Sequence, residues 1–413
     1  MNSTHVWKKN FRVLWLSQFL AIAGLTVLVP LLPIYISTLG DLSMGEIQFW
    51  SGLAIAAPAL TTMISSPFWG KLGDRISRKW MILRALFGLS LCLFLMAFAA
   101  TPLQFVFIRL LQGLFGGVVE ASNAFATSEA PETEQGHVLG KLQSSVSAGS
   151  LVGPLIGGVA ATIFGFSSLM MGIAILTFIA CLFGMKRLTE TEHPKIQEAS
   201  QVKGSVKQSY CCLLSSQITC RFIIVGVLAN FAMYGMITAL APLTSSVNHT
   251  FLDDKAAVGL LQSAFWMASI ISAPLWGYLN DKRHVKNVYL IATMICGVSV
   301  ILQGLATHLW ILLAFRILQG LTYSALIQSV MFVVVNASHN HLKGTFVGAT
   351  NSILVIGQIV GSMLGALITS TYNPVQTFIW MGVIFAASSV VLMSTHLSPI
   401  KEQKMMNKRM GVE

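Results

Sequence analysis

A glycine-rich stretch decides the fold of this chain: residues 149–158 read G-S-L-V-G-P-L-I-G-G. Gly149, Gly153 and Gly157 recur every four residues and therefore share one face of a helix. In an apolar segment, such a face lets a second helix approach until the two backbones touch. Pro154 removes one backbone donor from the same helix and kinks it. A kinked helix with a glycine face suits a membrane protein whose helices pack closely and still move against one another.

The composition of the whole chain indicates a membrane protein. Of its 413 residues, 54% are hydrophobic and only 10% are charged, whereas a soluble domain carries about 25% charged residues. Twelve apolar runs have the length of a membrane-spanning helix, about 20 residues each. They lie at 13–36, 47–70, 80–100, 103–127, 138–163, 166–186, 218–243, 256–279, 287–306, 309–335, 345–371 and 375–395. The first run lacks a small-residue cleavage site, so we interpret it as a retained helix rather than a signal peptide.

The positive charges predict the orientation of the chain. An even number of spans places both ends on one side of the membrane. With the N-terminus inside, Lys255 is the only one of 26 Lys and Arg residues in an outer loop. Cytoplasmic loops carry an excess of these residues, so we expect both termini in the cytoplasm. The net charge of +11 is then explained by the cationic cytoplasmic loops and their contact with anionic lipid. Nucleic acid is not expected as a partner.

The sequence lacks the usual signs of an enzyme or a metalloprotein. Its six cysteines are scattered and form no CxxC pair or Cys/His cluster. It also has no nucleotide-binding P-loop and no nucleophile elbow. We therefore expect no metal, no cofactor and no enzymatic activity.

The chain is an internal duplication. The segment S-S-P-F-W-G-K-L-G-D at 65–74 matches S-A-P-L-W-G-Y-L-N-D at 272–281, and R-L-L-Q-G-L at 109–114 matches R-I-L-Q-G-L at 316–321. In both cases the second copy follows 207 residues after the first. The spaced glycines return 208 residues later, without the proline, as Gly357, Gly361 and Gly365. A transporter built from two such parallel halves holds its site between them, near the middle of the membrane.

The duplication divides the chain into four segments. We expect an N-terminal six-helix bundle at 1–186, a polar cytoplasmic linker at 187–216, a C-terminal six-helix bundle at 217–396 and a cytoplasmic tail at 397–413. The predicted fold is thus an all-α integral membrane protein of twelve transmembrane helices in two pseudo-symmetric bundles. A monomer is expected.

The loop after the second span carries a further motif, which reads G-K-L-G-D-R-I-S-R-K at 70–79. Asp74 is expected to open the third span, because a carboxylate caps free N–H groups at a helix N-terminus. The motif resembles the signature G-x-x-x-D-R-x-G-R-K of the major facilitator superfamily, with Ser77 in place of the usual glycine. The resemblance implies that Gly70, Asp74 and Arg75 form a cytoplasmic latch that favours the outward-open state. The alternative is that the Lys and Arg residues of this loop only anchor it on the cytoplasmic side of the membrane.

The fourth span contains Arg109, Gln112 and Gly113, which match an R-x-x-Q-G pattern of the same superfamily. A buried arginine costs about 2.5–3.5 kcal/mol on insertion, so Arg109 should face the bundle interior or water. By resemblance, Arg109 is linked to proton transfer. The alternative is an arginine that ties its helix to backbone carbonyls of a neighbour. Arg316 is its equivalent in the second half.

Glu120 is the only one of 15 acidic residues that we place within a span. It follows Arg109 by 11 residues, close to three helical turns, which predicts one shared face with the two residues about 16 Å apart. Gln112 and Asn123 belong to the same polar stripe, which should line a cavity. A carboxyl group in a poorly hydrated cavity can carry a proton near neutral pH, so we expect Glu120 to exchange a proton for substrate. The alternative is a carboxylate at the cytoplasmic end that pairs with a lysine.

The glycine-rich stretch at 149–158 resembles the fifth-span signature of drug:proton antiporters in the same superfamily. The resemblance covers the whole chain and is closest to the twelve-span branch of bacterial multidrug exporters. It implies efflux across a bacterial cell membrane by alternating access, with Gly149, Gly153, Pro154 and Gly157 in the moving contacts. The chain departs from this branch in its first span, which has no acidic residue. A proton carrier must then lie outside the first span, which strengthens the prediction for Glu120.

Polar and aromatic residues inside other spans complete the predicted cavity. Asn230 and Tyr234 share a face of the seventh span, and Gln262 and Trp266 share a face of the eighth. The full set of predicted cavity residues is Gln112, Asn123, Gln143, Asn230, Tyr234, Gln262, Trp266, Arg316 and Gln358. For each of them the alternative is a hydrogen bond between helices.

Two functions follow from these observations. The first is proton-coupled efflux of small amphipathic molecules such as drugs. The second is dedicated export of one endogenous polar or zwitterionic metabolite, such as a metallophore, because buried arginines and amides suit carboxylate-bearing cargo. In both cases the partners are a small-molecule substrate, the proton and the lipid bilayer.

Overall fold

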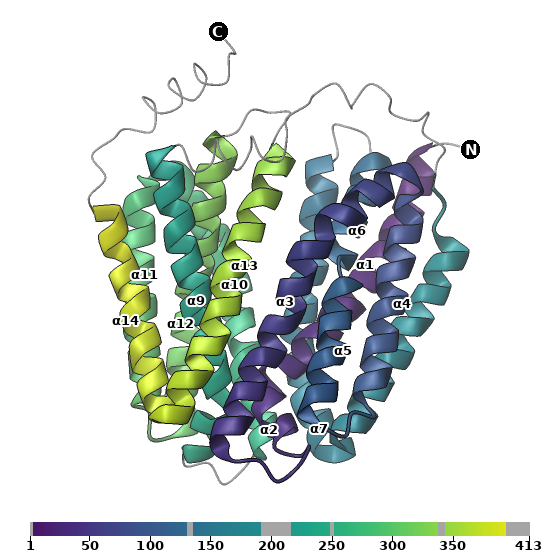
Figure 1. Ribbon diagram of the computed structural model, residues 1–413. Coiled ribbons are helices and arrows are strands. Elements are labelled where there is room, and N and C mark those ends of the chain that lie inside the picture. Colours follow the sequence, from purple (N-terminus) through teal and green to yellow (C-terminus); the bar gives the residue numbers. More distant parts are fainter. Residues whose placement is uncertain (1–2, 130–134, 191–215, 248–251, 338–342, 394–413) are drawn as a thin grey trace.

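The computed structural model describes residues 3–129, 135–190, 216–247, 252–337 and 343–393. Within these ranges the chain forms helices and no strand. Figure 1 shows the long helices standing side by side along one common direction.

The helices of the first half follow the predicted spans closely. They are α1 Ser3–Leu28, η1 Val29–Leu31, α2 Leu32–Ile36, α3 Met44–Arg75, α4 Arg78–Met96, α5 Pro102–Leu114, α6 Val118–Glu129 and α7 Gln135–Arg187. Those of the second half are α9 Gln217–Ser246, α10 Asp254–Lys282, α11 Val285–Gly304, α12 Leu309–Ala337, α13 Lys343–Thr371 and α14 Pro374–Met393.

The described helices account for all the predicted spans. Eleven segments are long and apolar enough to cross a membrane. One of them, within α7, holds two spans, because the chain reverses at Gly165 with φ 77° and ψ 169°. This φ lies in the left-handed region that glycine adopts readily. The all-α membrane fold predicted from the sequence is therefore confirmed.

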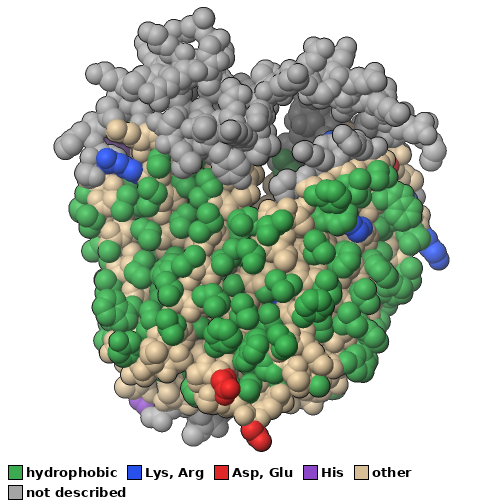
Figure 2. Space-filling view, viewed as in Figure 1, with side chains coloured by type: hydrophobic (Ala, Val, Ile, Leu, Met, Phe, Trp, Pro, Cys, Tyr) green, Lys and Arg blue, Asp and Glu red, His purple; other side chains and the backbone are tan. Residues whose placement is uncertain are grey.

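The outer surface suits a lipid environment. Figure 2 shows hydrophobic side chains over most of the face in view. The Lys and Arg side chains in this view lie nearer the end where α1 begins, and acidic side chains lie at the opposite end. Such a surface places the middle of the molecule in the hydrocarbon layer and the charges near its two boundaries.

The helices form two groups, with α1 to α7 on one side and α9 to α14 on the other (Figure 1). In each group the same pair packs most extensively, α1 on α7 in the first and α9 on α13 in the second. We call the face where α1 begins and α14 ends the terminal face. The opposite face, where α3 and α10 begin, is called the closed face.

The two groups meet through equivalent glycines near the closed face. Gly52 and Gly259 lie 207 residues apart, each early in its helix, α3 or α10. A Cβ atom on Gly52 would stand 2.7 Å from the Ser362 carbonyl oxygen of α13. Gly259 packs against α7, where a Cβ atom on Gly158 would stand 3.1 Å from its Cα. The halves thus touch backbone to backbone at the closed face, while Figure 2 shows a hollow between them at the terminal face.

Polar contacts reinforce the same junction. The Thr162 hydroxyl donates to a carboxylate oxygen of Asp253 at 2.7 Å. The Lys255 ammonium donates to the Ala161 carbonyl at 3.5 Å and lies 5.4 Å from the ring centre of Phe166. These groups come from the reversal of α7 around Gly165 and from the beginning of α10, so they help to hold the closed face shut.

The glycine-rich stretch at 149–158 serves two interfaces at once. Its spaced glycines pack on α1, where a Cβ atom on Gly153 would stand 2.5 Å from Thr26 Oγ1 and 2.6 Å from the Ala23 carbonyl oxygen. Pro154 and Gly158 face the other way, onto α10. One short sequence therefore holds its helix within the first half and also joins that half to the second.

The fourth span is broken, which the sequence analysis did not predict. It consists of α5 and α6, separated at residues 115–117, and Gly117 has a φ of 100°. The break frees backbone carbonyls, which accept hydrogen bonds from side chains of neighbouring helices. The Trp69 indole donates to the Leu114 carbonyl at 2.7 Å and Arg84 Nη2 donates to the Gly116 carbonyl at 2.9 Å. The assumption of one continuous helix from Arg109 to Glu120 is therefore wrong, although both residues line the same cavity.

Asp74 does not open the third span, contrary to the prediction. α3 continues through Asp74, and α4 begins after Ser77, whose hydroxyl accepts from the Trp80 N–H at 3.2 Å. The capping carboxylate comes from Glu190, which accepts from the Ser77 hydroxyl and from the Arg78 N–H at 2.9 Å. The residue that replaces the usual glycine of the motif is thus a helix cap, tied to the segment that follows α7.

The predicted division of the chain into two bundles with a linker remains a prediction. Of the linker at 187–216, only 187–190 and Ser216 are described. The tail at 397–413 lies outside the described residues.

We predict that Gly259→Ala weakens the closed face. The added methyl meets the backbone of Pro154, and overpacking costs about 1–3 kcal/mol, which changes an equilibrium about fivefold or more. We expect a cysteine placed at Ser352, in the cavity between the halves, to react correspondingly faster with an impermeant maleimide applied from the closed face. Gly172→Ala is the matched control, because a Cβ atom there meets nothing within 4 Å. Equal labelling rates in the two variants would contradict the prediction.

Candidate functional site

A cavity of about 490 Å³ lies between the two groups of helices. Its lining comes from α1, α3, α5 and α6 on one side and from α9, α10, α12 and α13 on the other. Both halves therefore contribute to one site, as expected for a chain built from two parallel repeats.

Six of the predicted site residues line this cavity. They are Arg109, Glu120, Tyr234, Gln262, Trp266 and Gln358. Two further polar residues of the second half, Tyr323 and Asn351, join them. The structure thus brings together, from six helices, residues that are up to 249 positions apart in the sequence, such as Arg109 and Gln358.

The other predicted cavity residues lie outside the lining. Gln112 is buried and accepts a hydrogen bond from Arg109. Arg316 is fully buried behind Gln262. Asn230 donates to the Gly226 carbonyl of its own helix at 3.3 Å. Asn123 is half-buried in α6, and Gln143 is exposed in α7.

Arg109 joins the fourth span to α3 and also reaches the cavity. Its Nε donates to the Ala54 carbonyl at 3.1 Å and its Nη1 donates to Gln112 Oε1 at 2.7 Å. Its Nη2 has no hydrogen-bond partner among the described residues. The side chain is only 2% exposed, so this remaining donor is available to a ligand in the cavity rather than to bulk water.

Arg316 acts on the cavity through Gln262. It donates through Nη1 to Gln319 Oε1 at 2.9 Å and through Nη2 to Gln262 Oε1 at 2.5 Å. Because the oxygen of Gln262 already accepts from Arg316, its amide nitrogen is the group left for a ligand. The two equivalent arginines thus present donors to the cavity in different ways, one directly and one through a glutamine.

Glu120 stands at the boundary of the cavity and a smaller side pocket. It is exposed, and it has no hydrogen bond or ion pair with any described residue. Among the described residues that line the cavity and the pocket, it is the only acid. The predicted alternative, a pair with a lysine, is therefore not found in the described part of the chain.

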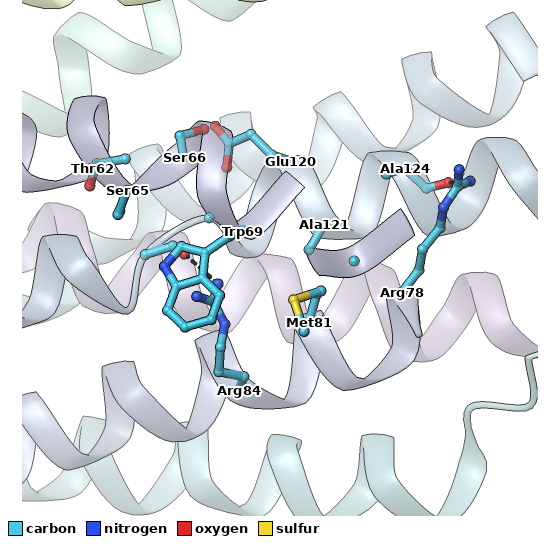
Figure 3. Close-up of a pocket in the computed structure, with 13 residues that line it drawn as sticks. Thr62, Ser65, Ser66, Trp69, Arg78, Met81, Arg84, Glu120, Ala121 and Ala124 are labelled. Atoms are coloured by element: carbon cyan, nitrogen blue, oxygen red, sulfur yellow. Dashed lines mark hydrogen bonds between the residues drawn. The ribbon is translucent and has the colours of Figure 1, made fainter. Parts of the chain in front are cut away.

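The side pocket has a volume of about 260 Å³ and lies within the first half, between α3, α4 and the broken fourth span. Figure 3 shows Glu120 beside Ser66 at its edge, and the Arg84 guanidinium beneath the Trp69 ring. The guanidinium carbon lies 3.7 Å from the ring centre. The pocket thus places a cation and a carboxyl group on opposite sides of a small space.

Sequence reasoning missed two contributions to these sites. Arg84 lies within the third span, and an arginine inside an apolar span is itself a signal of a functional site. Thr62 and Ser66 line both spaces from α3 and are four residues apart, so their spacing could have placed them on one face.

The predicted latch residues Gly70, Asp74 and Arg75 all lie in the last turns of α3. Their side chains are outside the described part of the structure. The latch therefore stays a prediction that follows from the resemblance.

Comparison with protein families gives one family model, described as Major Facilitator Superfamily, which matches residues 14–253 and 223–409. The chain is 67% identical over 407 residues to the staphyloferrin B transporter of Staphylococcus aureus, covering 98% of this chain and 97% of that protein. It is 28% identical to the multidrug resistance protein MdtG of Salmonella arizonae, covering 89% of this chain and 90% of that protein.

Solved structures of similar fold are also transporters. A bacterial homologue of the human lysosomal transporter Spinster, in an inward-facing and occupied conformation, gives a TM-score of 0.73 at 14% identity and covers 96% of each chain. The human organic anion transporter MFSD10 gives 0.66 at 17% identity, covering 94% of this chain and 99% of that one. At these identities the likeness concerns the fold alone.

We predict that Arg316→Met lowers the thermal stability of the protein and that Gln262→Leu partly restores it. The single change leaves the buried oxygen of Gln262 without a donor, at a cost of about 1–3 kcal/mol. The double variant removes both partners, which is closer to neutral. Thermal unfolding of the purified protein in detergent measures this. A double variant that is less stable than Arg316→Met alone would contradict the assigned contact.

Proposed function

The chain belongs to the major facilitator superfamily, and on this basis we propose that it exports staphyloferrin B, or a closely similar metallophore, in exchange for protons. It is a multi-pass transporter of a bacterial cell membrane and not an enzyme. The observation that carries the proposed substrate is the 67% identity to the staphyloferrin B transporter over 98% of the chain. Of the two functions open from the sequence, this favours the dedicated metabolite exporter.

The cavity offers hydrogen-bond donors suited to a carboxylate-bearing ligand. Arg109 contributes Nη2, Gln262 contributes its amide nitrogen, and Gln358 and Asn351 contribute further amides. Charged donors bind carboxylates more strongly than neutral ones, and their effect increases where water is excluded. This side of the cavity is therefore assigned to the acidic groups of the substrate.

Glu120 is the group we assign to the proton. It has no partner among the described residues, and it faces the same cavity as Arg109. One carboxylate cannot hold a proton and a cationic group of a zwitterionic substrate at the same time. Competition for Glu120 would therefore exchange one proton for each substrate molecule.

The contacts of the two halves support alternating access. The terminal face is assigned to the cytoplasm, because the described helix ends that carry Lys and Arg lie there, at Arg78 of α4, Lys186 of α7 and Lys282 of α10. On this assignment the structure is open to the cytoplasm and shut at the outer side by Gly52, Gly259, Pro154 and Gly158. The latch residues Gly70, Asp74 and Arg75 belong to the opposite state. One chain encloses the whole cavity, which supports a monomeric transporter.

Efflux of several amphipathic drugs is the second candidate. It is supported by the 28% identity to the multidrug resistance protein MdtG. It is also supported by the apolar part of the cavity lining, which includes Met63, Met233 and Trp266. Methionines and aromatic rings adapt to ligands of different shape.

Transport by inside-out membrane vesicles tests the proposal. Staphyloferrin B and a panel of lipophilic cations are offered in turn under an imposed pH gradient, acid inside. Uptake of staphyloferrin B alone supports the dedicated exporter, and uptake of the cations alone supports the second candidate. Accumulation that does not respond to the pH gradient would contradict proton exchange.

We predict that Glu120→Gln abolishes accumulation against a gradient. With one proton exchanged per substrate, each pH unit across the membrane supports about a tenfold substrate gradient. The variant should lose this tenfold accumulation of substrate per pH unit. It should still equilibrate substrate between the two sides of the membrane. Mass spectrometry of the vesicle contents measures it, with binding of substrate to the purified variant as the control for folding. Unchanged accumulation would exclude Glu120 as the proton carrier.

A further inference from the structure

Arg84 is a half-buried cation, and two of its three nitrogen atoms are buried without a hydrogen-bond partner. Its Nη2 donates to the Gly116 carbonyl, whereas Nε and Nη1 are buried and have no acceptor. A buried donor without a partner destabilises the protein, and more so when the group is charged. Stacking on Trp69 compensates for part of this cost. The guanidinium therefore lacks an acceptor that some other state of the site must supply.

Glu120 is the acid within reach of Arg84. The point where a Cβ atom of Gly117 would stand is 3.8 Å from Arg84 Nη2 and 3.8 Å from Glu120 Oε2. The two charged atoms are thus no further apart than twice that distance, and no side chain stands at Gly117 to separate them. Figure 3 shows one carboxyl oxygen of Glu120 beside Ser66 and the other on the side of Trp69 and Arg84, with no hydrogen bond drawn between Glu120 and Arg84. Rotation about the side-chain bonds of Glu120 is enough to bring the two groups together.

The other charged groups near Glu120 are already engaged or distant. Arg78, also in the side pocket, donates to the Ala124 carbonyl at 2.8 Å. Arg109 donates to Ala54 and Gln112. The titratable groups that line the cavity from the second half are the phenols of Tyr234 and Tyr323. Among the described residues of the two linings, only Arg84 combines a positive charge with buried donors that lack acceptors.

The two repeats carry this arrangement differently. Trp69 and its bond to the Leu114 carbonyl return in the second half as Trp276 and its bond to Leu321. Arg84 and Glu120 do not return, because the positions 207 residues later hold Ile291 and Ile327. The break in the fourth span is also absent there, since α12 runs unbroken from Leu309 to Ala337. The tryptophan is therefore part of the shared fold, whereas the cation, the acid and the break occur together in one half only.

We infer that Arg84 is the counter-ion of Glu120, which pairs with it through the side pocket whenever Glu120 has lost its proton. In this structure Glu120 faces the cavity beside Ser66, the orientation that we assign to its protonated form. Ionised Glu120 turns across Gly117 and accepts from the buried donors of Arg84. This inference rests on the proposed role of Glu120 as the proton carrier. It adds a positioning residue and a rotation that removes the ionised carboxylate from the cavity.

The pairing has a direct consequence for coupling. A carboxylate held by Arg84 no longer competes for the cationic group of a substrate, so the cavity can release its cargo once the proton has gone. The broken helix is needed for this, because Gly117 leaves the space through which the carboxylate turns and its φ of 100° disfavours other residues. The same break provides the Gly116 carbonyl that fixes one end of the guanidinium.

Infrared titration of the purified, full-length protein tests the inference without substrate or gradient. The C=O band of a protonated carboxyl group that is present in the wild type and absent in Glu120→Gln reports Glu120 alone. We expect Arg84→Gln to move the midpoint of this band to higher pH by about one to three units, because the ionised form loses an opposite charge at contact distance. Arg84→Lys should stay nearer to the wild type. No shift in Arg84→Gln, or no Glu120-dependent band at all, would overturn the inference.

Arg78→Gln is the matched control, since Arg78 lines the same pocket from the same helix and bonds elsewhere. Its midpoint should equal that of the wild type. A midpoint shift as large as that of Arg84→Gln would mean that any nearby positive charge affects the Glu120 band equally. That result would overturn the pairing. Because no transport is measured, failure of staphyloferrin B export would leave this result unaffected. Conversely, a wild-type midpoint in Arg84→Gln would leave the proposed export intact.

A second measurement covers the case in which Arg84→Gln does not fold. The double variant Arg84→Ile with Glu120→Ile reproduces the residues found at 291 and 327 in the second half. Each single variant leaves one unpaired charge, so the double variant should unfold at a higher temperature than either of them. A double variant that unfolds no higher than the more stable single variant would overturn the inference.

Discussion

Helices inside a bilayer gain nothing by hiding apolar side chains from water, so their association depends on how closely their backbones approach. This constraint is met here by glycines that touch the neighbouring backbone. Gly153 lets α7 lie against α1, and Gly158 lets the same helix lie against α10. In the second half, Gly361 of α13 packs against α9 and so repeats the contact of α7 with α1. Gly52 of α3 packs against α13 and so repeats the contact between the halves. The position of the cavity follows, because the halves meet at the closed face and separate toward the terminal face.

Around this symmetric frame the polar groups are distributed unequally. Both halves keep the arginine of the R-x-x-Q-G pattern, but Arg109 reaches the cavity itself and Arg316 reaches it through Gln262. Only the first half adds Arg84 and Glu120, and only there does the fourth span break. The chemistry that we assign to proton exchange is therefore concentrated in one half, whereas the second half supplies neutral amides and aromatic rings. Such a division lets one half bind the proton while both halves bind the cargo.

The likeness to a staphyloferrin B transporter and the chemistry of the cavity support the same proposal from independent directions. Donors at Arg109 and Gln262 suit acidic groups, and a single acid at Glu120 suits either a proton or a cationic group. A buried arginine costs stability in a membrane, and a ligand that bears carboxylates would compensate for part of this cost.

The sequence by itself determined the spans, the duplication and the membrane class, because these depend on composition and on the spacing of residues along one helix. It also determined six residues of the cavity lining, since a polar residue in an apolar span has few other places to go. Tertiary structure decided the rest. The break after Leu114, the capping of α4 by Glu190 rather than Asp74, and the position of Arg84 beside Glu120 all depend on contacts between helices. Spacing along a chain carries no information about which neighbour supplies a hydrogen-bond partner, because that partner comes from a different part of the sequence.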